Sequence, residues 1–354
     1  MAQKEKTGSI KIGRRRIGGE GPVFVVAELS ANHAHKLEVA LKTVRAAKRA
    51  GADAIKIQTY TPDTLTIDSA KKYFRIQGTL WDGRTLYDLY KEAYTPWEWH
   101  YKIKQAALEE GLTFFSTPFD RTAVDFLEEL GVPAYKIASF EMTDIPLLEY
   151  VAARKKPVIM STGISPLAEI GEAVAACRKT GNGELVLLKC TSSYPAPFEE
   201  MNLLTIPDMA KRFGCAAGLS DHSAGITAAV AAAALGAKVI EKHFILDRKI
   251  GGPDAAFSLE PAEFSLMVKS VREAEAALGK VNYKLSGRVK KNRIFARSLF
   301  AVGDIEKGEV ITEKNVRSIR PSYGLAPKYL PRILGRRAAR RIAKGTPFKM
   351  EFVS

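Results

Sequence analysis

Short apolar segments alternate with amphipathic segments along most of the chain. Eight of the apolar segments are nearly continuous, as is typical of parallel strands that are buried on both faces. Stretches with helical periodicity lie between them, for example residues 37–50, 96–110, 166–180 and 224–235. The eight predicted strands span residues 23–29, 54–60, 113–119, 134–139, 157–162, 185–190, 216–220 and 238–244.

Glycines follow the helical stretches at the position where a helix C-cap favours a residue that tolerates positive φ. Eight strand–helix units within about 260 residues predict a (β/α)8 TIM barrel of the α/β class. An open, doubly wound sheet is the structural rival, but it usually has fewer strands and a glycine-rich first turn, and no GxGxxG follows the first strand here. The glycines are Gly51, Gly111, Gly131, Gly181 and Gly236.

Two regions depart from this rhythm. Residues 62–95 show no clear strand and contain the segment Trp81-Asp82-Gly83-Arg84, and loops of this length are usually functional lids or partner surfaces. After the last barrel helix, a polar linker leads to short segments separated by turn signals. We therefore predict a TIM-barrel catalytic domain over residues 1–280, a linker over 281–293 and a small β-rich domain over 294–354.

Composition favours a globular protein without a membrane span. Hydrophobic residues make up 46% of the chain and charged residues 26%, and no apolar run approaches the ~18–20 residues that cross a bilayer. The N-terminal segment is polar and lacks the apolar core of a signal peptide. The three cysteines, Cys177, Cys190 and Cys215, show no CxxC spacing. We expect reduced thiols and a cytoplasmic location.

Positive charge is concentrated at the C-terminal end. Residues 286–354 hold 17 lysines and arginines against 5 acidic residues, which is most of the net charge of +15. A nucleic-acid-binding tail would show such asymmetry. However, these basic residues are interleaved with strand-like apolar stretches and carry no zinc-finger or RNP pattern. We expect an acidic small-molecule substrate or a solvated basic face, and no nucleic-acid partner.

Polar residues recur at the carboxyl ends of the predicted strands, which converge on one mouth in a β/α barrel. Lys56 and Lys136 interrupt apolar strands, and a buried ammonium needs a partner. Two cations with a ring of hydroxyl groups suit a small polyanion, such as a phosphate together with a carboxylate. The hydroxyl groups belong to Thr117, Ser139, Ser161 and Ser220.

His222 and His243 end adjacent predicted strands. Two imidazoles so placed can share one divalent cation and leave positions open for water and substrate. A hydrogen-bonded pair of structural histidines is an equal alternative on spacing alone. His33, His35 and His100 are each expected to be structural or solvent-facing.

Seven segments, in order and spacing, resemble the sialic acid synthase family, and within it the branch that makes pseudaminic acid. The tail, with Ile319-Arg320-Pro321, resembles the antifreeze-like (SAF) domain of these proteins. The segments are Val26-Ala27-Glu28-Leu29-Ser30-Ala31-Asn32-His33, Ala54-Ile55-Lys56-Ile57-Gln58-Thr59-Tyr60, Ser116-Thr117-Pro118-Phe119, Ala134-Tyr135-Lys136-Ile137-Ala138-Ser139, Ser161-Thr162-Gly163, Gly218-Leu219-Ser220-Asp221-His222 and Glu241-Lys242-His243-Phe244.

The resemblance implies a transferase that condenses phosphoenolpyruvate with the open-chain aldehyde of an N-acylated amino sugar. His222 and His243 would bind Mn²⁺, or Mg²⁺ or Co²⁺ in its place, and Glu28 would orient or deprotonate the attacking water. Arg320 of a second subunit would reach the acyl amide of the sugar, so a homodimer is implied. Phosphoenolpyruvate would contact Lys56, Thr117, Lys136, Ser139, Ser161, Ser192 and Ser220, and the sugar Gln58, Tyr194 and Asp254.

The substrate implied by this branch is 2,4-diacetamido-2,4,6-trideoxy-L-altrose. The alternative within the same chemistry is an N-acetylneuraminic or legionaminic acid synthase, which uses a mannose-configured sugar. A more distant alternative is a non-catalytic protein that binds carbohydrate or nucleic acid. Two departures concern the ligands: Ser192 stands where many sialic acid synthases have asparagine, and the first motif continues as Ala34-His35-Lys36.

Overall fold

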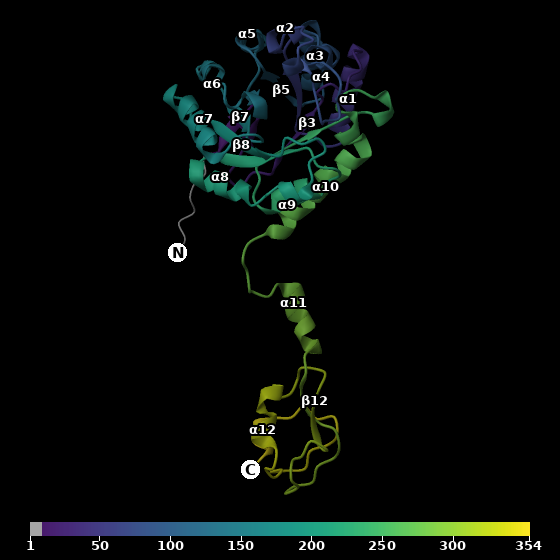
Figure 1. Ribbon diagram of the computed structural model, residues 1–354. Coiled ribbons are helices and arrows are strands. Elements are labelled where there is room, and N and C mark those ends of the chain that lie inside the picture. Colours follow the sequence, from purple (N-terminus) through teal and green to yellow (C-terminus); the bar gives the residue numbers. More distant parts are fainter. Residues whose placement is uncertain (1–8) are drawn as a thin grey trace. The chain divides into compact units, whose positions relative to one another are not determined.

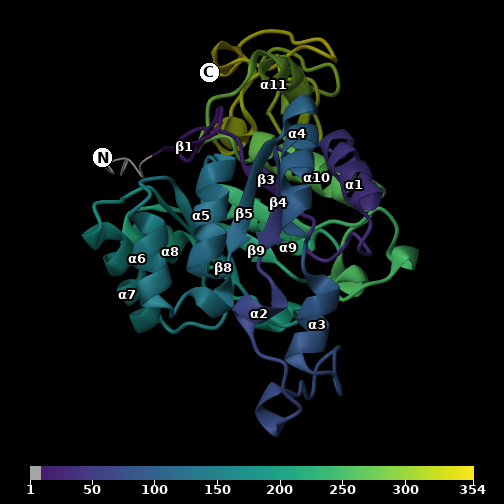
Figure 2. The ribbon, with the colours of Figure 1, turned by 90° about the horizontal axis from the view of Figure 1, so that it is seen from above.

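Eight parallel strands close into a barrel, which confirms the predicted fold. The computed structural model describes residues 9–354. The strands follow one another around the barrel in chain order, with β10 closing against β3, and helices surround them (Figures 1 and 2). The strands are β3 (Phe24–Glu28), β4 (Ala54–Thr59), β5 (Thr113–Pro118), β6 (Tyr135–Ile137), β7 (Val158–Ser161), β8 (Leu185–Cys190), β9 (Ala216–Asp221) and β10 (Val239–His243).

The barrel strands are almost entirely buried, because they carry apolar residues toward both the barrel interior and the helices. Their register brings chemically important residues level with one another. Glu28 lies opposite Lys56 on one side and opposite His243 on the other, and Glu241 lies opposite Ser220. Parallel pairing therefore places these strand ends at one mouth.

Ten α-helices lie in the unit that holds the barrel, within the described residues up to Gly279. The predicted glycines Gly51, Gly111, Gly131, Gly181 and Gly236 all adopt positive φ after helices. Among residues 9–354, no helix combines the length and the hydrophobicity needed to cross a bilayer. The helices are α1 (Leu37–Arg49), α2 (Pro62–Leu65), α3 (Leu86–Ala93), α4 (His100–Glu109), α5 (Arg121–Leu130), α6 (Ile145–Ala152), α7 (Leu167–Lys179), α8 (Thr205–Phe213), α9 (Thr227–Ala234) and α10 (Pro261–Leu278).

A short hairpin that the apolar pattern did not reveal precedes the barrel. Its strands are β1 (Ile10–Ile12) and β2 (Arg15–Ile17). The three isoleucines are buried in one apolar cluster with Phe24 and Val239, the first residues of β3 and β10. The hairpin thus closes the end of the barrel opposite the mouth, which leaves the mouth as the open end.

The insertion between β4 and α4 contains no strand, as predicted. It holds α2, a 3-10 turn at Lys72–Phe74 and α3, and α2 lies beside α3 (Figure 2). Thr61 caps α2 by accepting a hydrogen bond from the Thr64 backbone N–H. Thr85 caps α3 by accepting a hydrogen bond from the Asp88 backbone N–H. These caps fix two short helices that have few turns of their own.

Residues 280–354 form a separate compact unit. It contains α11 (Gly287–Asn292), the antiparallel strands β11 (Ser298–Ala301) and β12 (Val316–Ile319), and α12 (Leu330–Ile333). Its small core gathers residues such as Leu299, Ile311, Ile333 and Phe348. Helix α11 lies within the segment that was predicted as a linker.

Candidate active site

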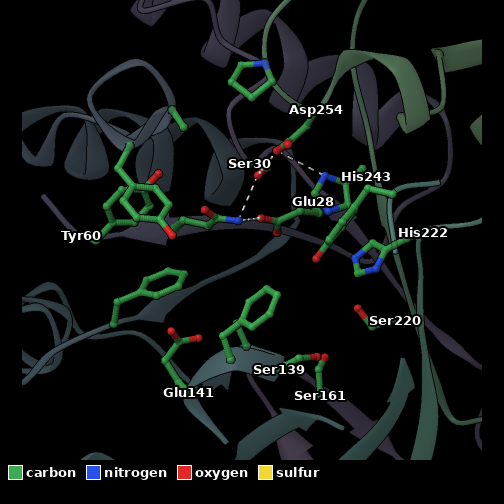
Figure 3. A pocket seen from close by; sticks show the side chains of 18 of the residues that line it. Glu28, Ser30, Tyr60, Ser139, Glu141, Ser161, Ser220, His222, His243 and Asp254 are labelled. Atoms are coloured by element: carbon green, nitrogen blue, oxygen red, sulfur yellow. Dashed lines mark hydrogen bonds and ion pairs between the residues drawn. The ribbon is translucent and has the colours of Figure 1, made fainter. Parts of the chain in front are cut away.

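A cavity of about 400 Å³ opens at the carboxyl ends of the barrel strands. Side chains from β3, β4, β6, β7, β8, β9 and β10 line one part of it, as Figure 3 shows for several of them. Residues of the insertion line another part. Of the residues predicted for the site, Glu28, Lys56, Gln58, Lys136, Ser139, Ser161, Tyr194, Ser220, His222, His243 and Asp254 line this cavity.

Four buried charged residues, Glu28, Lys56, Lys136 and Glu241, form what we call the charged floor. Lys56 Nζ lies 3.0 Å from Glu28 Oε2 and 3.3 Å from Glu241 Oε1. Lys136 Nζ lies 3.8 Å from the same oxygen of Glu241. None of the four is more than 4% exposed. Each ammonium therefore has a carboxylate partner, as burial of charge requires.

Burial and mutual attraction set the protonation of the floor. Burial raises the pKa of Glu28 to about 7, against the attraction of Lys56. Burial alone would also raise the pKa of Glu241, but Lys136 and Lys56 hold it below its ordinary value. Burial lowers the pKa of Lys136, with Glu241 opposing that effect. When Glu28 holds a proton, the floor has a net positive charge and suits an anion.

Hydroxyl groups surround the two lysines. Lys136 Nζ donates to Ser161 Oγ at 2.7 Å, and Lys56 Nζ donates to Thr117 Oγ1 at 3.1 Å. Ser220 Oγ donates to Glu241 Oε1 at 3.3 Å, and Ser139 Oγ accepts from the Gly163 backbone N–H at 3.0 Å. Thr117 is fully buried beside Lys56 and does not itself line the cavity.

The two histidines meet at the mouth, with ring centroids 5.3 Å apart. His222 Nδ1 lies 3.2 Å from the Thr191 carbonyl oxygen and 3.6 Å from Cys190 Sγ. His243 Nδ1 is buried and, among the described residues, has no hydrogen-bond partner. The nearest carboxylate oxygen to it is Asp254 Oδ2, at 3.7 Å.

The two histidines differ as metal ligands. Burial lowers the pKa of His222, but Cys190 and the Thr191 carbonyl more than offset this effect and hold that pKa above its ordinary value, so His222 must release its proton to bind a metal ion. His243 fits a metal ion more readily. Burial and the neighbouring positive charges hold the pKa of His243 well below its ordinary value, so its imidazole is neutral, which is the form that binds metals. A buried nitrogen without a partner is costly unless a ligand satisfies it. Residues 9–354 bring no three His, Cys, Asp or Glu side chains together around a metal position, so water or substrate would complete the coordination.

A second buried ion pair lies directly beside the histidines in sequence. Lys242 Nζ is 2.8 Å from Asp221 Oδ2, and both side chains are fully buried. Because side chains alternate along a strand, these residues face away from the side that His243 occupies. The pair joins β9 to β10 where the two histidines emerge.

Two of the three residues assigned to the sugar, Gln58 and Asp254, lie around Ser30. Gln58 Nε2 donates to Ser30 Oγ at 3.0 Å and to Glu28 Oε1 at 3.3 Å. Ser30 Oγ in turn donates to Asp254 Oδ2 at 2.5 Å (Figure 3). The Tyr194 ring tilts against His222 with centroids 4.5 Å apart.

Besides Thr117, two predicted residues lie outside the lining. Ser192 is half-buried, and its Oγ lies 3.8 Å from Cys190 Sγ. Arg320 follows β12 in the unit of residues 280–354 and is exposed. The lining of the cavity therefore includes neither residue.

Several residues of the cavity received no role in the sequence analysis. Glu241 lies two residues before His243 and so shares its face of β10, a signal that alternation could have supplied. Glu141 ends the 3-10 turn Ser139–Glu141, where no pattern marks it, and burial raises its pKa to about 7. Ser30 and Cys190 also line the cavity.

Comparisons with known proteins identify the family of the chain. Residues 43–283 match the NeuB family and residues 296–354 match the SAF domain. The chain is 52% identical to the pseudaminic acid synthase of Campylobacter jejuni over 92% of its length and 95% of the relative. It is 44% identical to that of Helicobacter pylori, over 93% and 97% of the two chains.

A solved structure gives the same result for the fold. The N-acetylneuraminic acid synthetase of Leptospira borgpetersenii, crystallised with citrate, is 32% identical to this chain and superposes with a TM-score of 0.72. The match covers 80% of this chain and 95% of the other.

Proposed function

Because the chain belongs to the NeuB family, we propose that it is a pseudaminic acid synthase. It would condense phosphoenolpyruvate with 2,4-diacetamido-2,4,6-trideoxy-L-altrose and water, giving pseudaminic acid and phosphate. The methylene carbon of phosphoenolpyruvate forms a bond to the aldehyde carbon, water adds at C2, and the C–O bond to phosphate then breaks. The charged floor beside the histidine pair carries this proposal.

The floor would hold phosphoenolpyruvate. Lys56 and Lys136 present ammonium groups to its carboxylate and phosphate, and such charge-assisted contacts are about twice as strong as neutral ones. Their carboxylate partners keep both lysines paired before the substrate enters. The hydroxyl groups of Ser139, Ser161 and Ser220 would complete the anion site. Thr117 and Ser192, which lie outside the lining, would support it, Thr117 by accepting a hydrogen bond from Lys56.

His222 and His243 would hold a divalent cation, Mn²⁺ or in its place Mg²⁺ or Co²⁺. When bound, the ion supplies Lewis acidity toward the aldehyde oxygen of the sugar. The buried, unpartnered Nδ1 of His243 supports this assignment. The ring stays neutral across the physiological range because its pKa is well below the ordinary value.

Two carboxyl groups with a pKa of about 7 would handle the protons. Glu28 would orient the attacking water or accept its proton, since a base works best when its pKa is close to the working pH. Glu141 would hold a proton near the departing phosphate. Gln58, Tyr194 and Asp254 would bind the sugar.

We also propose a role for each part of the chain. Residues 1–280 would carry the chemistry, residues 281–293 would act as the linker, and residues 294–354 would reach the active site of a second copy. Arg320 would there bind the acyl amide of the sugar. The three free cysteines are usual in a reducing compartment, which favours the cytoplasm as the site of action.

Phosphate release tests the reaction. The purified protein is incubated with phosphoenolpyruvate, Mn²⁺ and either the altrose sugar, its mannose-configured diacetamido counterpart or N-acetylmannosamine. We expect turnover with the altrose sugar. Turnover with N-acetylmannosamine and none with the altrose sugar would make the chain an N-acetylneuraminic acid synthase, and turnover with the mannose-configured diacetamido sugar alone would make it a legionaminic acid synthase. No phosphate release with any sugar would favour a non-catalytic binding protein.

Complementation tests the role of Arg320. Arg320→Ala should raise the KM for the sugar by roughly tenfold, as expected for one lost charge-assisted contact. Mixing it with Lys136→Met should restore part of the activity if arginine and lysine of one site come from different subunits. An unchanged sugar KM in Arg320→Ala would end this proposal, and the neighbouring exposed Arg317→Ala is the control.

A further inference from the structure

One side of the cavity is apolar, and neither phosphoenolpyruvate nor a metal ion explains it. We call it the apolar wall, and it comprises Ile76, Trp81, Leu86, Leu89, Tyr90 and Phe119. All of these except Phe119 belong to the insertion between β4 and α4. The charged floor, by contrast, comes from barrel strands.

Aromatic contacts and a hydrogen bond fix the wall in place. Tyr60 makes edge-on contacts with both Phe119 and Tyr90, at ring-centroid distances of 5.1 and 5.8 Å. Trp81 Nε1 donates to the Pro253 carbonyl oxygen at 3.1 Å, and its ring lies 5.7 Å from that of Tyr194. The donor of the indole is thereby used within the protein, so Trp81 presents carbon to the cavity.

The proposed reaction fixes which end of the sugar meets which side. The aldehyde carbon must lie beside the histidine pair and the floor, because there it joins phosphoenolpyruvate. Tyr60, which carries the aromatic contacts of the wall, lies across the cavity from His222 (Figure 3). The far end of the open-chain sugar, carbon 6, would therefore point away from the histidine pair and toward the wall.

We infer that the apolar wall selects sugars whose carbon 6 is a methyl group rather than a hydroxymethyl group. This inference rests on the proposed function. A hydroxyl group pressed against carbon atoms loses its water without gaining a hydrogen bond, whereas a methyl group gains apolar contact. The wall would select 6-deoxy sugars as a class. The residues around Ser30 would distinguish sugars that differ in the configuration of their ring-derived carbons.

The wild-type protein supplies the first test. Phosphate release is measured with the 2,4-diacetamido-6-deoxy altrose sugar and with its 6-hydroxy analogue, at saturating phosphoenolpyruvate. We expect kcat/KM to favour the 6-deoxy sugar by about 10- to 100-fold, the range that an apolar pocket achieves for one small group. Equal kcat/KM values would overturn the inference and leave the proposed reaction intact. No turnover of either sugar would instead count against the proposed function.

A pair of matched variants locates the selectivity. Leu86→Asn puts an amide on the wall, and Leu80→Asn makes the same change in the same insertion, at an exposed leucine outside the lining. Leu86→Asn should reduce the preference for the 6-deoxy sugar by about tenfold and leave the KM for phosphoenolpyruvate unchanged. Leu80→Asn should behave as wild type.

Identical selectivity in the two variants would show that the wall does not read carbon 6. Circular dichroism and the melting temperature of each variant establish that it is folded. Should Leu86→Asn not fold, the comparison of the two sugars on the wild-type protein still decides the inference.

Discussion

The two sides of the cavity are built by different means. The charged floor stands on barrel strands whose register is fixed by parallel pairing, and its four side chains form ion pairs with one another in the core. The apolar wall comes mainly from an insertion with two short, capped helices. A barrel can thus keep its chemistry while an inserted loop changes what it accepts, since loops tolerate change better than strands.

The difference also lies in how each side responds to a ligand. The floor holds two ammoniums against two carboxylates, one of which has a pKa of about 7, so a bound anion displaces a carboxylate from its lysine or favours the protonation of that carboxylate. The wall offers only contact area, whose contribution scales with the apolar surface removed from water. Substitutions on the two sides should therefore affect different kinetic constants.

Loss of a floor lysine should have the largest effect. Lys136→Met leaves Glu241 without one of its two cations and removes the contact that we propose to phosphoenolpyruvate. Removal of one partner of a buried ion pair costs roughly 2–5 kcal/mol, so kcat/KM for phosphoenolpyruvate should fall by about 10²- to 10³-fold. Lys238→Met, just before β10 and bonded to the Gly19 carbonyl, is the control. A loss below threefold would contradict the assigned role.

Loss of a histidine should act on the metal. His222→Ala should weaken Mn²⁺ binding, measured by titration calorimetry, by at least about 100-fold, since even indirect supports of a metal site cost 10- to 100-fold. Chelation should abolish wild-type activity, and added Mn²⁺ should restore it. His35→Asn replaces an exposed histidine and should bind as wild type. Full activity of the metal-free protein would refute the site.

A change in the wall should be smaller and confined to the sugar. Trp81→Ala removes the ring that contacts Tyr194 and should raise the KM for the sugar by about tenfold, as loss of apolar contact area predicts. The KM for phosphoenolpyruvate should stay essentially unchanged, because Trp81 lies on the wall and not on the floor. Trp81→Phe keeps an aromatic ring, so its KM for the sugar should lie between those of the wild type and of Trp81→Ala. Equal increases in both KM values would mean that floor and wall are not separable.

The smallest effect concerns stability and pH. Glu141 has a pKa of about 7 in the folded protein and an ordinary value of 4.5, so between these values the folded state binds more protons than the unfolded state. Rising pH across that window therefore lowers the stability of the wild type. Glu141→Gln lacks this dependence, so its melting temperature should rise relative to wild type from pH 5 to pH 8. A difference in melting temperature that does not change with pH would refute the raised pKa of Glu141. Glu129→Gln, at an exposed position, is the control.

The sequence alone determined the barrel and much of the floor. Continuous apolar runs predict buried parallel strands, and all eight appear within a few residues of their predicted bounds. Lysines that interrupt such runs must be paired, so Lys56 and Lys136 could be singled out before the structure was known. Position at the ends of adjacent predicted strands singled out His222 and His243.

Only the tertiary structure decided the rest of the site. Glu141 lies in a turn with no periodicity, and the insertion carries apolar residues that could equally have formed a small core of their own. Their place in the cavity depends on contacts across the chain, such as Trp81 with Pro253 and Tyr194. The hairpin at residues 10–17 was missed for the same reason. Its isoleucines are buried only because they pack against residues of distant barrel strands. Short-range pattern reports local periodicity, whereas these positions are fixed by long-range packing.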